Sequence, residues 1–202
     1  MKITTCDALE LDFLPGISQI VCLDEVVSTQ EVGRELAAGG SSEKTLVLAE
    51  TQTGGKGRQG REWKSARGGL YMTLLLRPEA GVKFLPDLSV LSGEVLAKTI
   101  SSLYGIKTRV KKPNDVYAFH PRRRKWLKIS GVLTESASIN TAASWLLLGV
   151  GVNLNNTVKL ETGVSVKAIT GNTVSRADFL KEFFQLFWLR YAAWEYSSRA
   201  KS

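Results

Sequence analysis

Apolar residues in this chain fall into short runs of strand length, and stretches with helical periodicity separate those runs. Each run is bounded by glycine, proline or charged residues, a pattern typical of buried strands. The five runs are Ile17–Leu23, Thr45–Thr51, Leu70–Leu76, Ile129–Thr134 and Trp145–Asn153. None approaches the roughly 20 apolar residues that a membrane-spanning helix needs. The sequence therefore predicts a soluble α/β or α+β protein in which helices pack against a sheet.

Three helical stretches carry recognisable end signals. They are Thr29–Ala38, Leu88–Tyr104 and Arg176–Tyr196. Ser28 and Ser175 stand at N-cap positions with an acidic residue at the capping-box position, and glycine follows the first two stretches. The last stretch places aromatic residues along one face, which favours a core or interface role over ligand stacking. These aromatic residues are Phe179, Phe183, Phe184, Phe187, Trp188, Tyr191 and Trp194.

Length and composition favour one compact domain over residues 1–202, which is long enough to bury a core. The first dozen residues are acidic and lack the features of a secretory signal. Two cysteines, Cys6 and Cys22, are too few for a disulfide framework or a zinc site, so a reducing compartment is the simplest prediction. We therefore expect a cytoplasmic protein.

Positive charge is concentrated in two short segments. The formal net charge is +8, and of 27 lysines and arginines five lie in residues 56–67 and nine in residues 107–128. This distribution indicates an anionic partner. The basic segments show no interleaved aromatic platform and no nucleic-acid-binding motif, so the sequence does not favour a nucleic-acid binder, although that class would explain the charge.

Residues 54–61 follow the predicted strand Thr45–Thr51 and combine four glycines with three cations. Glycine lets backbone amides approach an anion while lysine and arginine neutralise it, as in phosphate-binding loops. The spacing is not that of a P-loop. Taken alone, the segment is also compatible with a solvated basic hairpin.

Four ordered motifs give this loop a context. They are Gln52-x-x-Gly55-Lys56-Gly57-Arg58-x-Gly60-Arg61-x-Trp63, Lys111-x-Pro113-Asn114-Asp115, Lys128-x-x-Gly131-x-Leu133-x-Glu135 and Gly149-x-Gly151-x-Asn153. In this order they closely resemble the catalytic domain of biotin–protein ligases, within the biotin/lipoate protein ligase family. The resemblance runs from about Val26 to the C-terminal helix, nearly the whole chain.

The resemblance implies a two-layer α+β fold, with a mixed and largely antiparallel sheet packed by helices, like the class II aminoacyl-tRNA synthetase catalytic fold. It also implies an ATP-dependent ligase that forms biotinyl-5′-AMP and transfers biotin to a lysine of a biotin-carboxyl-carrier domain. The expected ligands are biotin, ATP and Mg²⁺, the ion near Asp115, and a homodimer is compatible with the family. We expect neither a DNA-binding domain nor a C-terminal SH3-like domain in residues 1–202, and neither DNA nor a membrane as a partner.

Site residues follow from the matched motifs. Lys128 and Arg58 are the expected catalytic residues, because cations must offset the repulsion between a carboxylate and a triphosphate. The resemblance assigns biotin binding to Ser28, Thr29, Gln30, Gln52, Gly55, Lys56, Gly57, Arg58, Lys128, Gly131, Leu133 and Gly149. It assigns ATP or adenylate binding to Arg58, Arg61, Trp63, Lys111, Asn114, Asp115, Lys128 and Asn153.

Several of these residues have simpler explanations. Ser28 is a helix cap, Trp63 is compatible with core burial, and Asn114-Asp115 after proline is a turn signature. Lys128 outside its motif would be a charge at the edge of a strand.

The chain departs from the family pattern in the residues around these motifs. Lys112 replaces a customary tryptophan and Lys56 a customary arginine. These two substitutions are expected to affect the ordering of the glycine-rich loop and the affinity for the nucleotide. Val27 and Gln30 replace a customary aspartate and asparagine. The competing functions are a lipoate or octanoate ligase or transferase of the same fold, a degenerate binding protein, and a basic nucleic-acid-binding domain.

Overall fold

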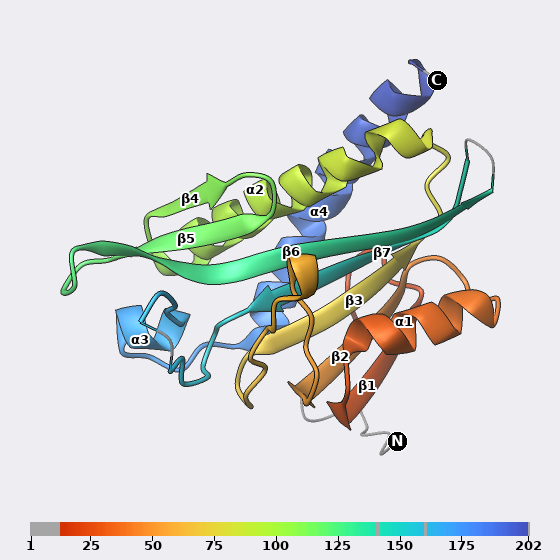
Figure 1. The fold of residues 1–202 in the computed structure, drawn as a ribbon. Helices are drawn as coiled ribbons and strands as arrows, with labels where there is room; N and C mark the ends of the chain where they lie inside the picture. Colours follow the sequence, from red (N-terminus) through yellow and green to blue (C-terminus); the bar gives the residue numbers. More distant parts are fainter. Residues whose placement is uncertain (1–12, 140–141, 160, 202) are drawn as a thin grey trace.

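A seven-stranded sheet forms the centre of the computed structural model, which describes residues 13–139, 142–159 and 161–201 (Figure 1). The strands are β1 (Gln19–Val26), β2 (Thr45–Gln52), β3 (Leu70–Leu76), β4 (Thr108–Lys111), β5 (Asp115–His120), β6 (Lys125–Ile139) and β7 (Ala142–Val152). The helices are α1 (Thr29–Ala38), α2 (Leu85–Tyr104), α3 (Val166–Thr170) and α4 (Arg176–Arg199), with 3-10 turns η2 (Arg58–Gly60) and η3 (Val82–Phe84). The acidic N-terminal segment and Cys6 lie outside the described residues.

The strand order is β1-β2-β3-β7-β6-β5-β4. Only β1 and β2 pair in parallel, and every other neighbouring pair is antiparallel. The prediction of a mixed, largely antiparallel sheet packed by helices is therefore confirmed.

Helices cover the two faces of the sheet unequally. On one face α2 packs against β4, β5 and β6, and α4 packs against α2. The aromatic face of α4 lies in the main core, where Phe179, Phe183 and Phe187 are fully buried, as predicted. On the opposite face α1 lies mainly over β2, β3 and β7, and Gln30 and Arg34 extend from it to Leu133 and Glu135 of β6. Strands β4 and β5 carry no described α-helix on that face, and the η2 turn lies over β6 (Figure 1).

The predicted helix ends agree with the structure more closely than the strand ends. Ser28 caps α1 by accepting a hydrogen bond from the backbone N–H of Gln30 at 3.3 Å, and Ser175 caps α4 by accepting one from Asp178 at 3.1 Å. Gly105 ends α2 with φ of 65°, a left-handed conformation that favours glycine. Glu31 pairs with Lys56 at 2.6 Å, and among the described residues its carboxylate accepts no hydrogen bond from the Ser28 backbone N–H, so the expected capping box is incomplete.

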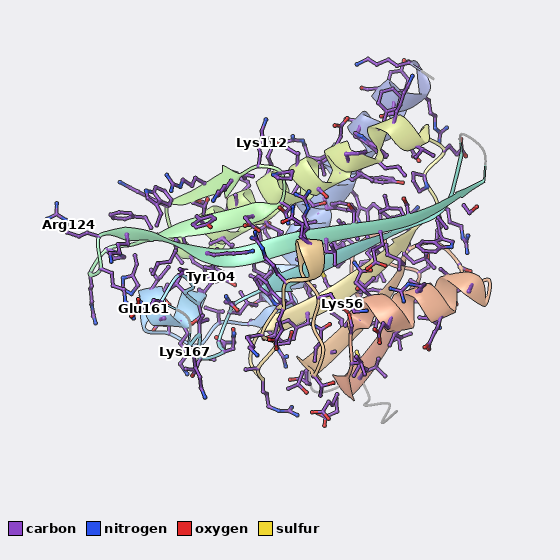
Figure 2. All side chains as sticks on the ribbon, viewed as in Figure 1. Lys56, Tyr104, Lys112, Arg124, Glu161 and Lys167 are labelled. Carbon is purple, nitrogen blue, oxygen red and sulfur yellow. The ribbon has the colours of Figure 1, made fainter. Side chains whose placement is uncertain are left out.

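Strands β4 and β5 and helix α3 were not predicted, and β6 is much longer than the run Ile129–Thr134. The sequence of β4, Thr-Arg-Val-Lys, contains a single apolar residue inside the basic segment, so it lacks the apolar run that marks the buried strands. The hairpin between β5 and β6 projects from the sheet and carries Arg124 at its tip, while Lys112 follows β4 (Figure 2).

Among the described residues, no helix is both long and apolar enough to cross a membrane.

Candidate ligand-binding site

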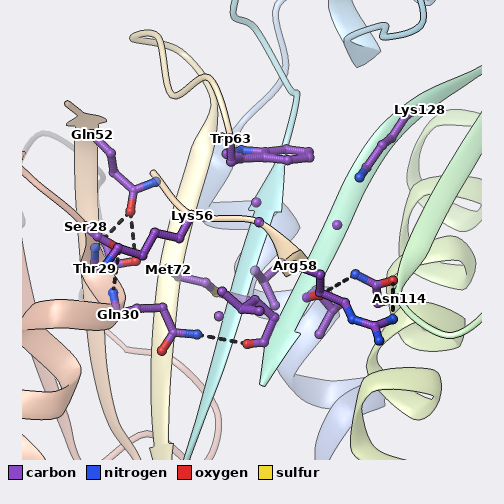
Figure 3. Close-up of a pocket in the computed structure, with 17 residues that line it drawn as sticks. Ser28, Thr29, Gln30, Gln52, Lys56, Arg58, Trp63, Met72, Asn114 and Lys128 are labelled. Atoms are coloured by element: carbon purple, nitrogen blue, oxygen red, sulfur yellow. Dashed lines mark hydrogen bonds between the residues drawn. The ribbon is translucent and has the colours of Figure 1, made fainter. Parts of the chain in front are cut away.

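One pocket, partly open to solvent, lies between the start of α1 and the middle of the sheet (Figure 3). It brings together most of the predicted site residues from five separate parts of the chain. These are Ser28, Thr29, Gln30, Gln52, Lys56, Gly57, Arg58, Trp63, Asn114, Lys128, Gly131, Leu133 and Gly149. Because β7 lies between β3 and β6, residues distant in sequence meet across the central strands.

A cluster of neutral hydrogen-bonding groups occupies the α1 end of the pocket. The side-chain carbonyl of Gln52 accepts hydrogen bonds from the Thr29 backbone N–H at 2.8 Å and from its hydroxyl at 3.2 Å. The Gln52 amide donates to Ser65 at 2.7 Å, and the Thr73 hydroxyl donates to that of Thr29 at 2.9 Å. This network fixes the side chains of Thr29 and Gln52, so their polar atoms are preorganised.

Gln30 and Gly149 face each other in the same pocket. The Gln30 amide donates to the backbone carbonyl of Leu133 at 2.9 Å, whereas its side-chain carbonyl Oε1 is buried without a hydrogen-bond partner among the described residues. A Cβ at Gly149 would lie 2.3 Å from Gln30 Nε2, so only glycine leaves room for this side chain. A buried unpaired carbonyl is costly, and a ligand that donates a hydrogen bond would satisfy it.

Trp63 lies against the sheet beside two glycines. A Cβ at Gly151 would approach the indole ring to 2.5 Å, and one at Gly131 would approach it to 3.2 Å. The indole Nε1 is buried with no hydrogen-bond partner among the described residues. The two glycines therefore create the flat surface on which this ring rests, and the ring adds a second free polar atom to the pocket.

A β-bulge aims Lys128 into the pocket. In the antiparallel ladder of β5 and β6, Val116 pairs with Ser130 and Tyr117 with Lys128, so Ile129 is an extra residue. Strict alternation would place Lys128 and Gly131 on opposite faces, and the bulge restores them to one face. The Lys128 ammonium lies 2.7 Å from the Asp115 carboxylate and 5.2 Å from the centre of the Trp63 ring.

Arg58 approaches the pocket from the glycine-rich loop, within the η2 turn. Its guanidinium donates to the Asn114 side chain at 3.3 Å, and the Asn114 amide donates to the carbonyl of Val132 at 2.9 Å. Asn114 therefore holds Arg58 over β6, on the same side of the pocket as Lys128 (Figure 3). Lys56 turns toward α1 and pairs with Glu31.

Five predicted site residues do not line this pocket. Gly55 is buried behind the Trp63 backbone, where a Cβ would meet the Trp63 carbonyl at 2.4 Å. Arg61 lines the outer side of the glycine-rich loop, and Lys111 is exposed on β4. Asp115 contacts the site through Lys128, and Asn153 is buried after β7, where its side chain accepts from Asn156 at 2.9 Å.

Four lining residues were missed: Met72, Val132, Val150 and Gly151. The first three are apolar residues of buried strands, and nothing in the sequence distinguishes them from core residues. Gly151 belongs to the Gly-x-Gly pair of its motif, and that spacing was the available signal, since alternate residues of a strand share a face.

The described residues contain no group of three or more histidine, cysteine, aspartate or glutamate side chains placed to hold a metal ion. Asp115, the carboxylate that the sequence assigned to the Mg²⁺ end of the site, is engaged by Lys128. The residues present therefore do not fit a metal site built from protein side chains alone.

The chain belongs to the biotin/lipoate A/B protein ligase family, whose profile matches residues 26–153. It is 30% identical over 179 residues to the bifunctional ligase/repressor BirA of Bacillus spizizenii, covering 85% of this chain and 53% of that protein. It is 34% identical over 152 residues to the biotin--[acetyl-CoA-carboxylase] ligase of Paracoccus denitrificans, covering 71% of this chain and 61% of that protein. The chain thus spans about half the length of its Bacillus relative.

Among solved structures, the biotin protein ligase of Aquifex aeolicus in complex with biotin and ATP has a similar fold. Its TM-score is 0.74 at 30% sequence identity, and the match covers 90% of this chain and 74% of that one.

Proposed function

We propose that this protein is an ATP-dependent biotin–protein ligase, which joins biotin to AMP and then transfers biotin to a lysine of a carrier domain. One observation carries the proposal: a single pocket joins a neutral amide–hydroxyl cluster around Gln52 to two cations, Lys128 and Arg58. Biotin has the same arrangement of groups, a polar neutral ring at one end and a carboxylate at the other. The Bacillus and Paracoccus relatives and the Aquifex structure support the same function.

The polar end of the pocket matches the ureido group, which both donates and accepts hydrogen bonds. In our proposal Ser28, Thr29 and Gln52 bind this group, and Gln30 Oε1 is a further acceptor in the same pocket. Met72, Val132 and Val150 supply apolar contacts for the rest of the ligand. An octanoate chain would leave the polar groups unpaired, so these groups favour biotin over the lipoate or octanoate alternative.

The cationic end of the pocket matches the chemistry of adenylation. A biotin carboxylate oxygen bonds to the α-phosphorus of ATP, the bond to the bridging oxygen breaks, and pyrophosphate leaves. The two anions repel each other by about 1 kcal/mol in water at about 4 Å and by about 4 kcal/mol at an effective dielectric constant of about 20. Lys128 and Arg58 would offset this repulsion and stabilise the charge that develops in the transition state. In the second step the acceptor lysine attacks the carbonyl carbon and AMP leaves.

The remaining site assignments belong to the same proposal. Gly55, Lys56, Gly57, Gly131, Leu133 and Gly149 complete the biotin side, and Arg61, Trp63, Lys111, Asn114, Asp115 and Asn153 the adenylate side. Mg²⁺ would enter on the phosphates of ATP, since Asp115 already pairs with Lys128. A cytoplasmic location, a homodimer and a single catalytic unit over residues 1–202 stay predictions.

The test mixes the protein with Mg-ATP and an equimolar mixture of biotin and octanoate, and detects the acyl adenylates by mass spectrometry. We expect biotinyl adenylate, with discrimination on the order of 10⁴ because the polar groups that bind biotin would be unpaired with octanoate. Octanoyl adenylate as the product would refute the proposal. Lys128→Ala should nearly abolish the biotin product. Lys125→Ala is the matched control, because Lys125 begins the same strand and does not line the pocket.

A further inference from the structure

On the face opposite α2, strands β4 and β5 and the start of β6 carry a row of cations and aromatic rings that continues outward from Lys128. Arg109 pairs with Tyr117 across β4 and β5, and Tyr117 pairs with Lys128 across β5 and β6. Residues that pair across strands share a face. One row of side chains therefore leads from the edge strand to the pocket.

Aromatic residues interleave with these cations. The guanidinium of Arg109 lies 4.6 Å from the centre of the Trp126 ring and 5.9 Å from that of Tyr117. The Lys111 ammonium lies 5.8 Å from the Tyr117 ring, and the Phe119 and Trp126 rings are 5.5 Å apart. The sequence-based expectation that the basic segments lack an aromatic platform is therefore wrong, because the rings come from β5 and β6 and meet the β4 cations only in the folded sheet. We call Lys107, Arg109, Lys111, Tyr117, Phe119 and Trp126 the platform.

The charges on and beside the platform are unusual in lacking acidic partners. Residues 107–128 contain nine lysines and arginines and one acidic residue, Asp115. Among the described residues, only Lys128 of these nine forms an ion pair. Elsewhere in the described chain eight cations are paired, among them Arg34, Arg67 and Arg176. Unpaired like charges on one surface repel one another, and an external anionic surface would relieve that repulsion.

We propose that the platform is the docking surface for an acidic face of the protein domain that carries the acceptor lysine. This inference rests on the proposed function and names the surface that its second step uses. The acceptor lysine must approach Lys128 and Arg58 as a side chain that is itself mostly protonated near neutral pH. Acidic groups of the carrier that bind beside the site offset this repulsion and orient the lysine.

A protein partner fits the platform better than a nucleic acid does. Single-stranded nucleic acids bind such surfaces by stacking bases on free aromatic faces. Here Arg109 already lies over Trp126, and Lys111 is close to Tyr117. The rings of Trp126 and Tyr117 hold the cations in place, so a partner would contact the charged groups rather than the ring faces. Arg124, at the hairpin tip, extends the basic surface further from the pocket (Figure 2).

The test reverses two platform charges in Lys107→Glu/Arg109→Glu, neither of which lines the pocket. The matched control, Lys98→Glu/Lys181→Glu, makes the same change in net charge at exposed positions of α2 and α4. The probe is the unbiotinylated biotin-carrier domain of acetyl-CoA carboxylase from the same organism. Biotinyl-adenylate formation without the carrier is measured in parallel, and circular dichroism checks the fold. The neutral pair Lys107→Gln/Arg109→Gln serves if the reversed variant fails to fold.

We expect the platform variant to raise KM for the carrier domain about tenfold, with kcat and adenylate formation within about twofold of wild type. The wild-type KM should rise with salt, and the variant should lose much of this dependence. A KM no higher than that of the control variant would overturn the docking surface and leave the proposed function intact. Absence of biotinyl adenylate from the wild type would overturn both. Weakened binding of a single-stranded oligonucleotide with an unchanged carrier KM would assign the platform to nucleic acid and overturn the inference.

Discussion

Gly149→Ala tests the geometry of the pocket through one contact. The new Cβ would lie 2.3 Å from Gln30 Nε2 and 3.0 Å from its Cδ, so the Gln30 side chain must move. Moving it breaks the 2.9 Å hydrogen bond to the Leu133 carbonyl, in a part of the pocket where the Gln30 side chain is buried. Leaving buried polar groups unpaired costs about 1–3 kcal/mol, and we expect the free energy of unfolding to fall by that amount.

The assay is a double-mutant cycle with Gln30→Ala, followed by urea unfolding and by calorimetric titration with biotin. Truncating Gln30 removes the obstructing amide, so the cost of Gly149→Ala should largely disappear in that background. The coupling energy should be about 1–3 kcal/mol in stability, within the range of about 0.5–3 kcal/mol measured for residues in contact. Equal costs of Gly149→Ala in both backgrounds would show that the two residues do not compete for this space. Weaker biotin binding by both single variants would in addition place Gln30 in the ligand site.

Two further predictions concern charge inside the fold. Burial and the neighbouring Arg123 and Arg122 lower the pKa of His120, the single histidine, below 6.5. The unfolded chain therefore binds the proton more readily, and the stability that neutral His120 contributes is present above pH 6.5 and lost as pH falls through its folded pKa. Urea unfolding at pH 8 and at pH 5.5 should show this loss, and His120→Gln should reduce it; an equal loss in the variant would refute the assignment. Glu50 pairs with Arg176 at 2.6 Å with side-chain exposures of 11% and 17%, so Glu50→Gln should cost about 1.5–3 kcal/mol by urea unfolding. Glu94→Gln breaks an exposed pair with Arg190 and should cost at most about 1 kcal/mol; similar costs for the two variants would contradict the role of burial.

Elements with strong local signals could be predicted from the sequence. The helix Thr29–Ala38 and the strand Leu70–Leu76 were predicted with the same bounds that the structure gives. Each has a clear boundary signal and a regular apolar pattern. The strands β4 and β5 could not be predicted in this way, because half of their residues face the open side of the sheet and are polar or aromatic. Their identity depends on pairing with β6, which is a tertiary property.

The sequence predicted which residues line the site more successfully than it predicted the contacts between them. Thirteen of the predicted residues line the pocket, because ordered motifs identify residues even when their contacts are unknown. The contacts themselves were not foreseen. Glu31 was expected to cap a helix and pairs with Lys56, and Asp115 was expected near a metal ion and pairs with Lys128. Long side chains choose among nearby partners, and that choice depends on distances that only the folded sheet sets.

Lys128 shows most clearly why sequence spacing alone does not predict which face of a strand a side chain occupies. It stands three residues before Gly131, and in a regular strand that odd separation would turn its side chain toward α2 and the core. An ammonium buried there without a partner would cost several kcal/mol. The extra residue Ile129 removes this conflict, because the bulge returns Lys128 to the face of Gly131 while Ile129 itself becomes fully buried. Ile129, which the sequence assigned to an ordinary strand, is therefore the residue that directs Lys128 into the pocket. The cationic end of the pocket thus depends on how β5 and β6 pair.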